Sequence, residues 1–209
     1  KGRSYAGGQN GGWSAPALNA ASPAAVPWTE DRLYDYLRNG QSATHGVAAG
    51  PMADVVRNLD QVPDADLKAI ATYVAAIAGE ASKERREQAE KALARAKGVS
   101  QPRQVGPAAG ASIYAGACAQ CHGEAGRKPV NPALNLSLST AVQAGDPNNL
   151  IRIVLGGIAP IDNGPGPIMP GFAAVLTDNQ VADLVDYLRA SFTDRTAFSS
   201  VETAVRKAR

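Results

Sequence analysis

The chain has 209 residues, 44% of them hydrophobic, and a net charge of +2, an ordinary composition for a globular protein. This charge is too balanced for the basic surface of a nucleic-acid-binding protein, so we expect no nucleic-acid partner. Because no run of about 18 apolar residues is present, we expect no direct membrane span. Residues 1–15 lack a secretion signal, but the chain begins without methionine, and we expect that a segment was removed upstream.

The first half of the chain contains two predicted amphipathic helices. Residues 29–40 begin with an N-cap threonine, place apolar residues at helical spacing and end at a glycine. Residues 64–77 carry an apolar stripe at a period of about 3.6 residues. Met52 lies between these helices, and His45 precedes it by seven residues. We interpret His45 as an ordinary loop histidine rather than a metal ligand.

A charged segment separates the two halves. Residues 80–97 are rich in Glu, Lys, Arg and Ala and predict a solvated helical spacer, and residues 98–102 predict a loose joint. No segment alternates apolar and polar residues persistently enough to predict a sheet. The predicted fold class is therefore all-α.

The second half contains three predicted helices. Residues 110–117 precede a pair of cysteines, and residues 146–157 form a short amphipathic helix that stops at a glycine. Residues 178–192 carry an apolar stripe, and the preceding Thr177 with Gln180 predicts a capping box at their start.

Four features of the first half recur in the second half in the same order, which indicates an internal repeat. Each methionine follows the glycine that ends its short helix by twelve residues, and the chain has no other methionine. We therefore expect two tandem helical domains, residues 1–79 and 105–209, joined by a charged linker over residues 80–104. The matched pairs are 15–19 with 131–135, 29–40 with 146–157, Met52 with Met169, and 64–77 with 178–192.

The only two cysteines, Cys118 and Cys121, are separated by two residues and followed directly by His122. This spacing is typical of covalent haem attachment, because both sulfurs reach one porphyrin edge while the imidazole binds iron. A redox disulfide or half of a zinc site are the alternatives. Zinc would need further ligands, and the remaining histidine is distant in the sequence. A thioredoxin-like site would need a βαβ setting that this helical sequence lacks.

Met169 is the predicted sixth ligand of the iron. A lone methionine more often fills a gap in a core than binds a metal. Met169, however, stands between prolines in a stretch too broken to form a helix, between the short helix and the final helix, and this setting favours ligation. Pro132, ten residues after His122, is predicted to offer its carbonyl to the other imidazole nitrogen and so to fix the tautomer.

The second half resembles a class I cytochrome c domain over about residues 106–193, through the Cys118 to His122 motif, the sequence around Met169 and the closing helix. The resemblance implies a compact helical bundle around haem c, with His122 and Met169 as axial ligands and one porphyrin edge exposed for electron transfer. It also implies a periplasmic location, with any membrane association coming through a partner or a segment not present.

The first half repeats Met52 but not the paired cysteines, which leaves two interpretations. Either the motif precedes Lys1 in the native protein and Met52 is an iron ligand, or the unit has lost its haem and serves as a docking module. We favour the first interpretation, because Met52 keeps the spacing of a ligand, and so expect a second haem c.

The tandem layout resembles the cytochrome c subunits of periplasmic dehydrogenases. The stretch 44–52 and the ending 201–209 are similar to subunits that accompany molybdenum hydroxylases, although a quinoprotein dehydrogenase is also a candidate partner. The implied function is electron transfer from a large dehydrogenase subunit to an acceptor protein or a quinone-linked chain. A dihaem peroxidase is the alternative. The cations at positions 127, 128 and 152 are candidates for steering an acidic partner.

Overall fold

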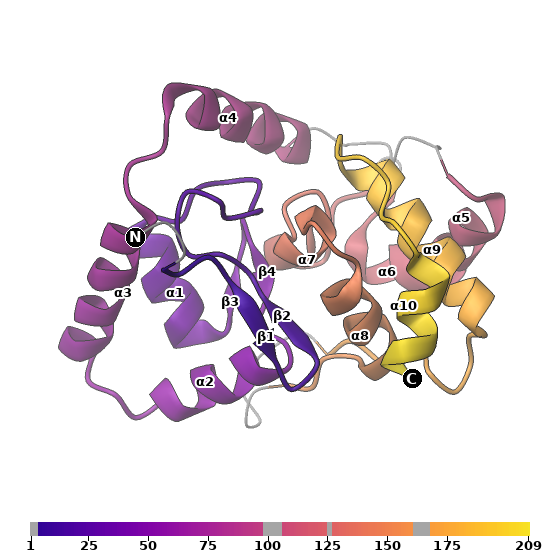
Figure 1. The fold of residues 1–209 in the computed structure, drawn as a ribbon, viewed down its shortest axis with the longest axis horizontal. Helices are drawn as coiled ribbons and strands as arrows, with labels where there is room; N and C mark the ends of the chain where they lie inside the picture. The colour runs from indigo at the N-terminus through magenta and orange to yellow at the C-terminus, as the bar shows by residue number, and fades with distance from the viewer. Residues whose placement is uncertain (1–3, 98–105, 125–126, 161–167) are drawn as a thin grey trace.

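A computed structural model of the chain describes residues 4–97, 106–124, 127–160 and 168–209. The helices of residues 30–78 gather on one side of the molecule and those of residues 108–208 on the other, with one helix along the upper edge (Figure 1). Within the described residues, no helix has both the length and the apolar character needed to cross a bilayer.

The first half contains α1 (Glu30–Asn39), α2 (Pro51–Leu59) and α3 (Asp64–Ala78). The hydroxyl of Thr29 accepts a hydrogen bond from a backbone N–H of the first turn of α1, and Gly40 ends that helix in the left-handed conformation, φ 67°. These caps confirm the boundaries predicted from the sequence. α1 packs against α3, and its Leu33 and Leu37 are buried.

Two short hairpins correct the all-α prediction. β1 (Gly8–Asn10) pairs antiparallel with β2 (Trp13–Ala15), and β3 (Gln41–Ser42) with β4 (Gly46–Val47). The first hairpin turns through two glycines with φ of 53° and 81°, as a two-residue turn requires. Strands of two or three residues are too short to show the alternation that predicts a sheet.

The second half is built from short helical segments around two longer ones. In chain order they are α5 (Ala108–Ile113), the π-helical turn η1 (Tyr114–Cys118), α6 (Ala119–His122), the 3₁₀ turn η2 (Pro132–Leu134), α7 (Thr140–Gln143), α8 (Asn148–Gly156), α9 (Asp178–Phe192) and α10 (Val201–Ala208). The predicted capping box at the start of α9 is present. The segments pack around one apolar core that includes buried faces of α8 and α9.

The core of the second half depends on close contact between α5 and α9. A Cβ atom at Gly110 would lie 2.2 Å from the Asp183 carbonyl oxygen, so only glycine allows this approach. One turn later, the Tyr114 ring packs against Tyr187 and Phe192, with centroids 5.5 and 5.3 Å away. This packing fixes the start of the cysteine motif relative to α9.

The charged segment forms α4 (Lys83–Lys97), but it is not only a solvated spacer. Ala89 is buried between Val26 of the first half and Leu138 of the second. Arg85 donates hydrogen bonds to backbone carbonyls in the first half. α4 therefore packs against both halves, which its polar composition did not predict.

The two halves, residues 4–78 and 106–209, meet along a boundary that we call the seam. Backbone and side-chain hydrogen bonds tie the first-half hairpins to the second half, including two between Ser14 and Asn149 at 2.8 and 2.7 Å. The Thr140 N–H donates to the His45 carbonyl at 3.0 Å. The seam consists of the pairs Ser14–Asn149, Gln41–Asn131, His45–Thr140 and Pro23–Arg195.

Candidate functional site

The cysteine motif begins at the π-helical turn η1 and continues through α6. Cys118 closes η1 and is buried, whereas Cys121 in α6 is exposed. Single π-helical turns are rare and occur frequently at functional sites. Burial, with a smaller effect from Cys121, raises the pKa of Cys118 to about 11, so this thiol is protonated at neutral pH. A redox-active cysteine would need the opposite shift.

His122 ends α6, and its ring is oriented by a backbone carbonyl. Its Nδ1 lies 2.8 Å from the carbonyl oxygen of Leu134, so Nδ1–H donates and the Nε2 lone pair is left for a metal. Burial lowers the pKa of His122, although this hydrogen bond opposes the shift. The ring is therefore neutral near pH 7, as iron ligation requires.

The prediction that the Pro132 carbonyl accepts the hydrogen bond from His122 named the wrong acceptor. The Pro132 carbonyl accepts a hydrogen bond from the Asn135 N–H within the turn η2, and this turn carries the chain on so that Leu134 reaches His122. The expected kind of hydrogen bond is present, but its acceptor lies two residues further along the chain.

Met169 is held beside the end of α8 by a backbone bridge. It exchanges both backbone hydrogen bonds with Ile158, at 2.9 and 3.0 Å. Cβ atoms at Gly157 or Gly171 would lie 2.3 Å from the Met169 carbonyl oxygen and 2.7 Å from the Leu155 carbonyl oxygen. The glycines thus allow the methionine segment to lie directly against the helix, and Met169 packs partly buried against the core.

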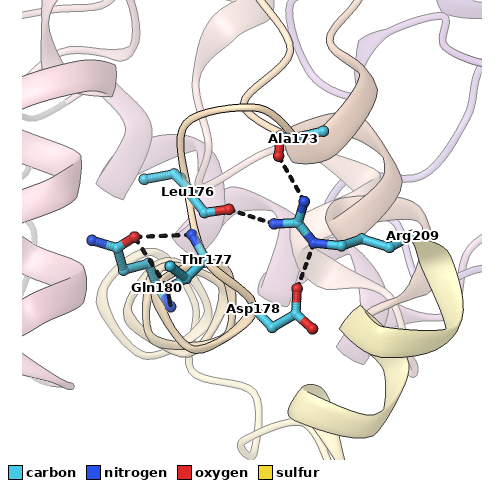
Figure 2. A network of polar contacts seen from close by, with 6 residues as sticks. All are labelled: Ala173, Leu176, Thr177, Asp178, Gln180 and Arg209. Atoms are coloured by element: carbon cyan, nitrogen blue, oxygen red, sulfur yellow. Dashed lines mark hydrogen bonds and ion pairs between the residues drawn. The ribbon is translucent and has the colours of Figure 1, made fainter.

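The segment after Met169 is held by Arg209, as Figure 2 shows. The guanidinium donates to the carbonyls of Ala173 and Leu176 and pairs with Asp178 at the start of α9. The capping box of the same helix lies beside this network. α10 therefore helps to fix the chain between the methionine and α9.

Four of the five residues predicted for the haem site of the second half line one cavity of about 1340 Å³, and Pro132 is not among its described lining residues. This volume exceeds the roughly 300–1,000 Å³ of ordinary small-molecule pockets and suits a group of porphyrin size. Thiols for two thioether bonds, a neutral imidazole and a thioether sulfur are the donors that haem c requires. The residues present therefore fit haem c. The four are Cys118, Cys121, His122 and Met169.

Met52 lines the same cavity from the first half. It is the second residue of α2, so its backbone is helical, unlike that of Met169. The described first half contains no cysteine, and its histidine is engaged elsewhere. The structure thus brings Met52 to the cavity wall, and the second imidazole that lines this cavity, His45, has both ring nitrogens in hydrogen bonds.

His45 is more than an ordinary loop histidine, which corrects the sequence interpretation. It is only 4% exposed, and its ring stacks on Trp28 with centroids 3.4 Å apart. Nε2 donates to the Val26 carbonyl at 2.9 Å, and Nδ1 accepts from the Thr44 hydroxyl at 2.8 Å. Burial lowers the pKa of His45 to about 4. In the sequence, the residues around His45 are mostly small and apolar, and this pattern is too weak to predict that the His45 side chain is buried.

Sequence reasoning also missed three arginines on the cavity wall. Arg85, Arg189 and Arg195 line the cavity, whereas the cations at positions 127, 128 and 152 do not appear among its described lining residues. The three come from α4, α9 and the segment after α9, so no local pattern links them.

Comparison with known proteins agrees with this geometry. Residues 107–191 match the protein-family model described as cytochrome c. The chain is 40% identical over 193 residues to a nicotinate dehydrogenase subunit of Pseudomonas putida, a match that covers 91% of this chain and 16% of that protein. It is 30% identical over 229 residues to the fructose dehydrogenase cytochrome subunit of Gluconobacter japonicus, which covers 98% and 45%.

A third relative is the gluconate 2-dehydrogenase cytochrome c subunit of Pantoea cypripedii, 34% identical over 191 residues, covering 87% of this chain and 41% of that protein. The chain spans less than half the length of each of these relatives, and the alignments extend over both of its halves. The family match over residues 107–191, with the predicted haem-binding residues on one cavity, identifies a cytochrome c domain in the second half of this chain.

Proposed function

We propose that this chain is an electron-transfer cytochrome c subunit that relays electrons from a partner dehydrogenase to an external acceptor. The observation that carries the proposal is that two thiols, an oriented neutral imidazole and a methionine sulfur line one porphyrin-sized cavity. The relatives support it, because each is named as a subunit of a dehydrogenase.

Each residue has one role at this site. Cys118 and Cys121 would attach the ring through thioether bonds, and His122 and Met169 would be the two protein ligands of the iron. Haem c supplies an iron that accepts and releases one electron at a time. The hydrogen bond from His122 to Leu134 keeps the imidazole in one tautomer and one orientation. Ligation by histidine and methionine raises the iron's reduction potential.

Replacing Met169 with alanine tests this assignment. We expect the ferric protein to lose its sulfur-to-iron charge-transfer band, the reduction potential to fall, and the reduced protein to bind carbon monoxide. Met52→Ala is the matched control and should leave the spectrum of the haem at Cys118 unchanged. In a chain that carries haem only at Cys118 and Cys121, a band that persists in Met169→Ala would refute the ligand assignment. Tight carbon monoxide binding by the unmodified protein would favour haem catalysis over electron transfer.

We further propose that residues 1–79 form a second cytochrome-like unit, that residues 80–104 link it to residues 105–209, and that Met52 is its candidate iron ligand. Met52 lines the shared cavity. Tyr73 of α3 corresponds to Tyr187 of α9, yet it is 61% exposed whereas Tyr187 is 4% exposed. The difference arises because α5 covers α9, and no described helix covers that face of α3. Iron per polypeptide in the native protein tests the proposal: two or more atoms support it, and one favours a haem-less docking unit.

For the partner, we propose a dehydrogenase of the molybdenum hydroxylase type in the periplasm. The similarity to a nicotinate dehydrogenase subunit supports this partner over a quinoprotein, because the identity of 40% is higher than the 29–32% found for the quinone-linked alcohol dehydrogenase subunits. Identification of the large subunit that co-purifies with the native protein tests the choice. A quinoprotein in its place would refute it.

A further inference from the structure

Three arginines bring positive charge to the cavity wall along the seam. Arg85 reaches it from α4, Arg189 from α9, and Arg195 from the segment after α9. Arg85 donates to the carbonyls of Ser22 and Ala24, and Arg195 donates to that of Pro23 between them. Arg189 and Arg195 also donate to the adjacent residues Val142 and Gln143. The three guanidinium groups therefore converge on one region.

Among the described residues, these guanidinium groups have hydrogen-bond partners but form no ion pair with a carboxylate. Arg189 donates to the carbonyls of Val142 and Thr196, and Arg195 to Pro23 and to the Gln143 side chain. No ion pair found among the described residues involves any of the three. Arg189 is buried, Arg85 is half-buried and Arg195 is exposed. A guanidinium fork matches the geometry of a carboxylate. The wall is therefore suited to an anionic group.

The other ionisable groups on the cavity wall agree with this conclusion. Asp146 is the only carboxylate in the described lining, and it already accepts hydrogen bonds from Ser14 and from the Asn148 N–H. From the first half, His45 and Tyr36 also line the cavity. Burial lowers the pKa of His45 to about 4 and raises the pKa of Tyr36 to about 12, so both side chains are neutral near pH 7.

We propose that Arg85 and Arg195 bind the two carboxylate groups of the haem attached to Cys118 and Cys121. The inference rests on the proposed function, because that haem is the anion bound in this cavity. Arg189 acts as a positioning residue, since its guanidinium is held by two carbonyls and packs 4.2 Å from the Phe198 ring centroid. The haem carboxylates then point toward the seam, where α4 and both halves meet.

The arrangement has an electrostatic consequence. Arginines beside the haem carboxylates keep those groups ionised over the physiological pH range and partly cancel their charge at the iron. With the arginines present, the reduction potential should be independent of pH between pH 5 and pH 8. Without one of them, the iron experiences more negative charge, and a carboxylate begins to take up protons within this range.

The test compares reduction potentials of the haem-loaded chain with those of Arg85→Gln and Arg195→Gln between pH 5 and pH 8. Arg86→Gln is the matched control, because Arg86 is the exposed neighbour of Arg85 on α4 and does not appear in the described cavity lining. We expect each cavity variant to favour ferric iron at pH 8 by threefold or more, or about 28 mV for one electron. We also expect its potential to become pH-dependent. Arg195→Lys should restore most of the potential, and Arg86→Gln should behave as wild type.

The outcomes separate this inference from the proposed function. Variants with a normal haem spectrum but wild-type, pH-independent potentials would overturn the inference alone. So would a wild-type protein whose potential already varies between pH 5 and pH 8. A chain that attaches no haem at Cys118 and Cys121 would overturn the proposed function and the inference with it. An altered spectrum in Arg85→Gln and Arg195→Gln without a potential change would indicate a structural role only.

Discussion

Acidification should destabilise the protein through His45. Its pKa is about 4 in the folded protein, because the ring is buried and because Arg32 and Arg85 lie near it, whereas an exposed histidine titrates near 6.5. As the pH falls, the unfolded chain therefore binds a proton before the folded one. The stability is fully present above pH 6.5 and is lost as the pH falls toward 4. Between pH 8 and pH 5 this single group should lower the free energy of unfolding by about 2 kcal/mol.

His45→Phe isolates this effect, since phenylalanine keeps a ring against Trp28 but cannot take up a proton. The variant should be less stable at pH 8, because the hydrogen bond to the Val26 carbonyl is lost, by about 1 kcal/mol. Its stability should nevertheless fall less steeply with acid than that of wild type. Denaturant unfolding from pH 5 to pH 8 measures the slopes, and NMR titration of the His45 ring in the reduced protein measures its pKa. Equal slopes, or an inflection near pH 6.5, would refute the reasoning.

Two further predictions concern the packing of the second half. Gly110→Ala should lower the stability by about 1–3 kcal/mol in thermal or denaturant unfolding, because the new Cβ would force α5 away from Asp183. Gly116→Ala is its control, since no atom lies within 4 Å of a Cβ there, and an equal loss in both variants would contradict the packing argument. Arg209→Gln should release α10 from the segment beside Asp178 and lower the stability by about 1 kcal/mol. An unchanged thermal midpoint would show that the network in Figure 2 contributes nothing measurable.

The helices of this protein are largely determined by local sequence. α1 begins at a threonine N-cap and ends at a glycine, and α9 carries its own capping box, so their boundaries could be predicted without tertiary information. The motif of Cys118, Cys121 and His122 is local in the same sense, because covalent attachment to one porphyrin edge needs only a short spacing along one turn. That part of the site, and the choice of Met169 from its proline-flanked setting, followed from the sequence.

Tertiary packing decided the features that join residues distant in the chain. The acceptor for His122 is the Leu134 carbonyl rather than that of Pro132, because the turn η2 uses the proline carbonyl for its own hydrogen bond. His45 is buried because Trp28 stacks on it, and neither residue alone carries that information. The same holds for the arginines of the seam. A cap or a spacing acts within one turn of chain, whereas burial, charge convergence and cavity shape depend on which segments meet in space, and one sequence does not show which segments meet.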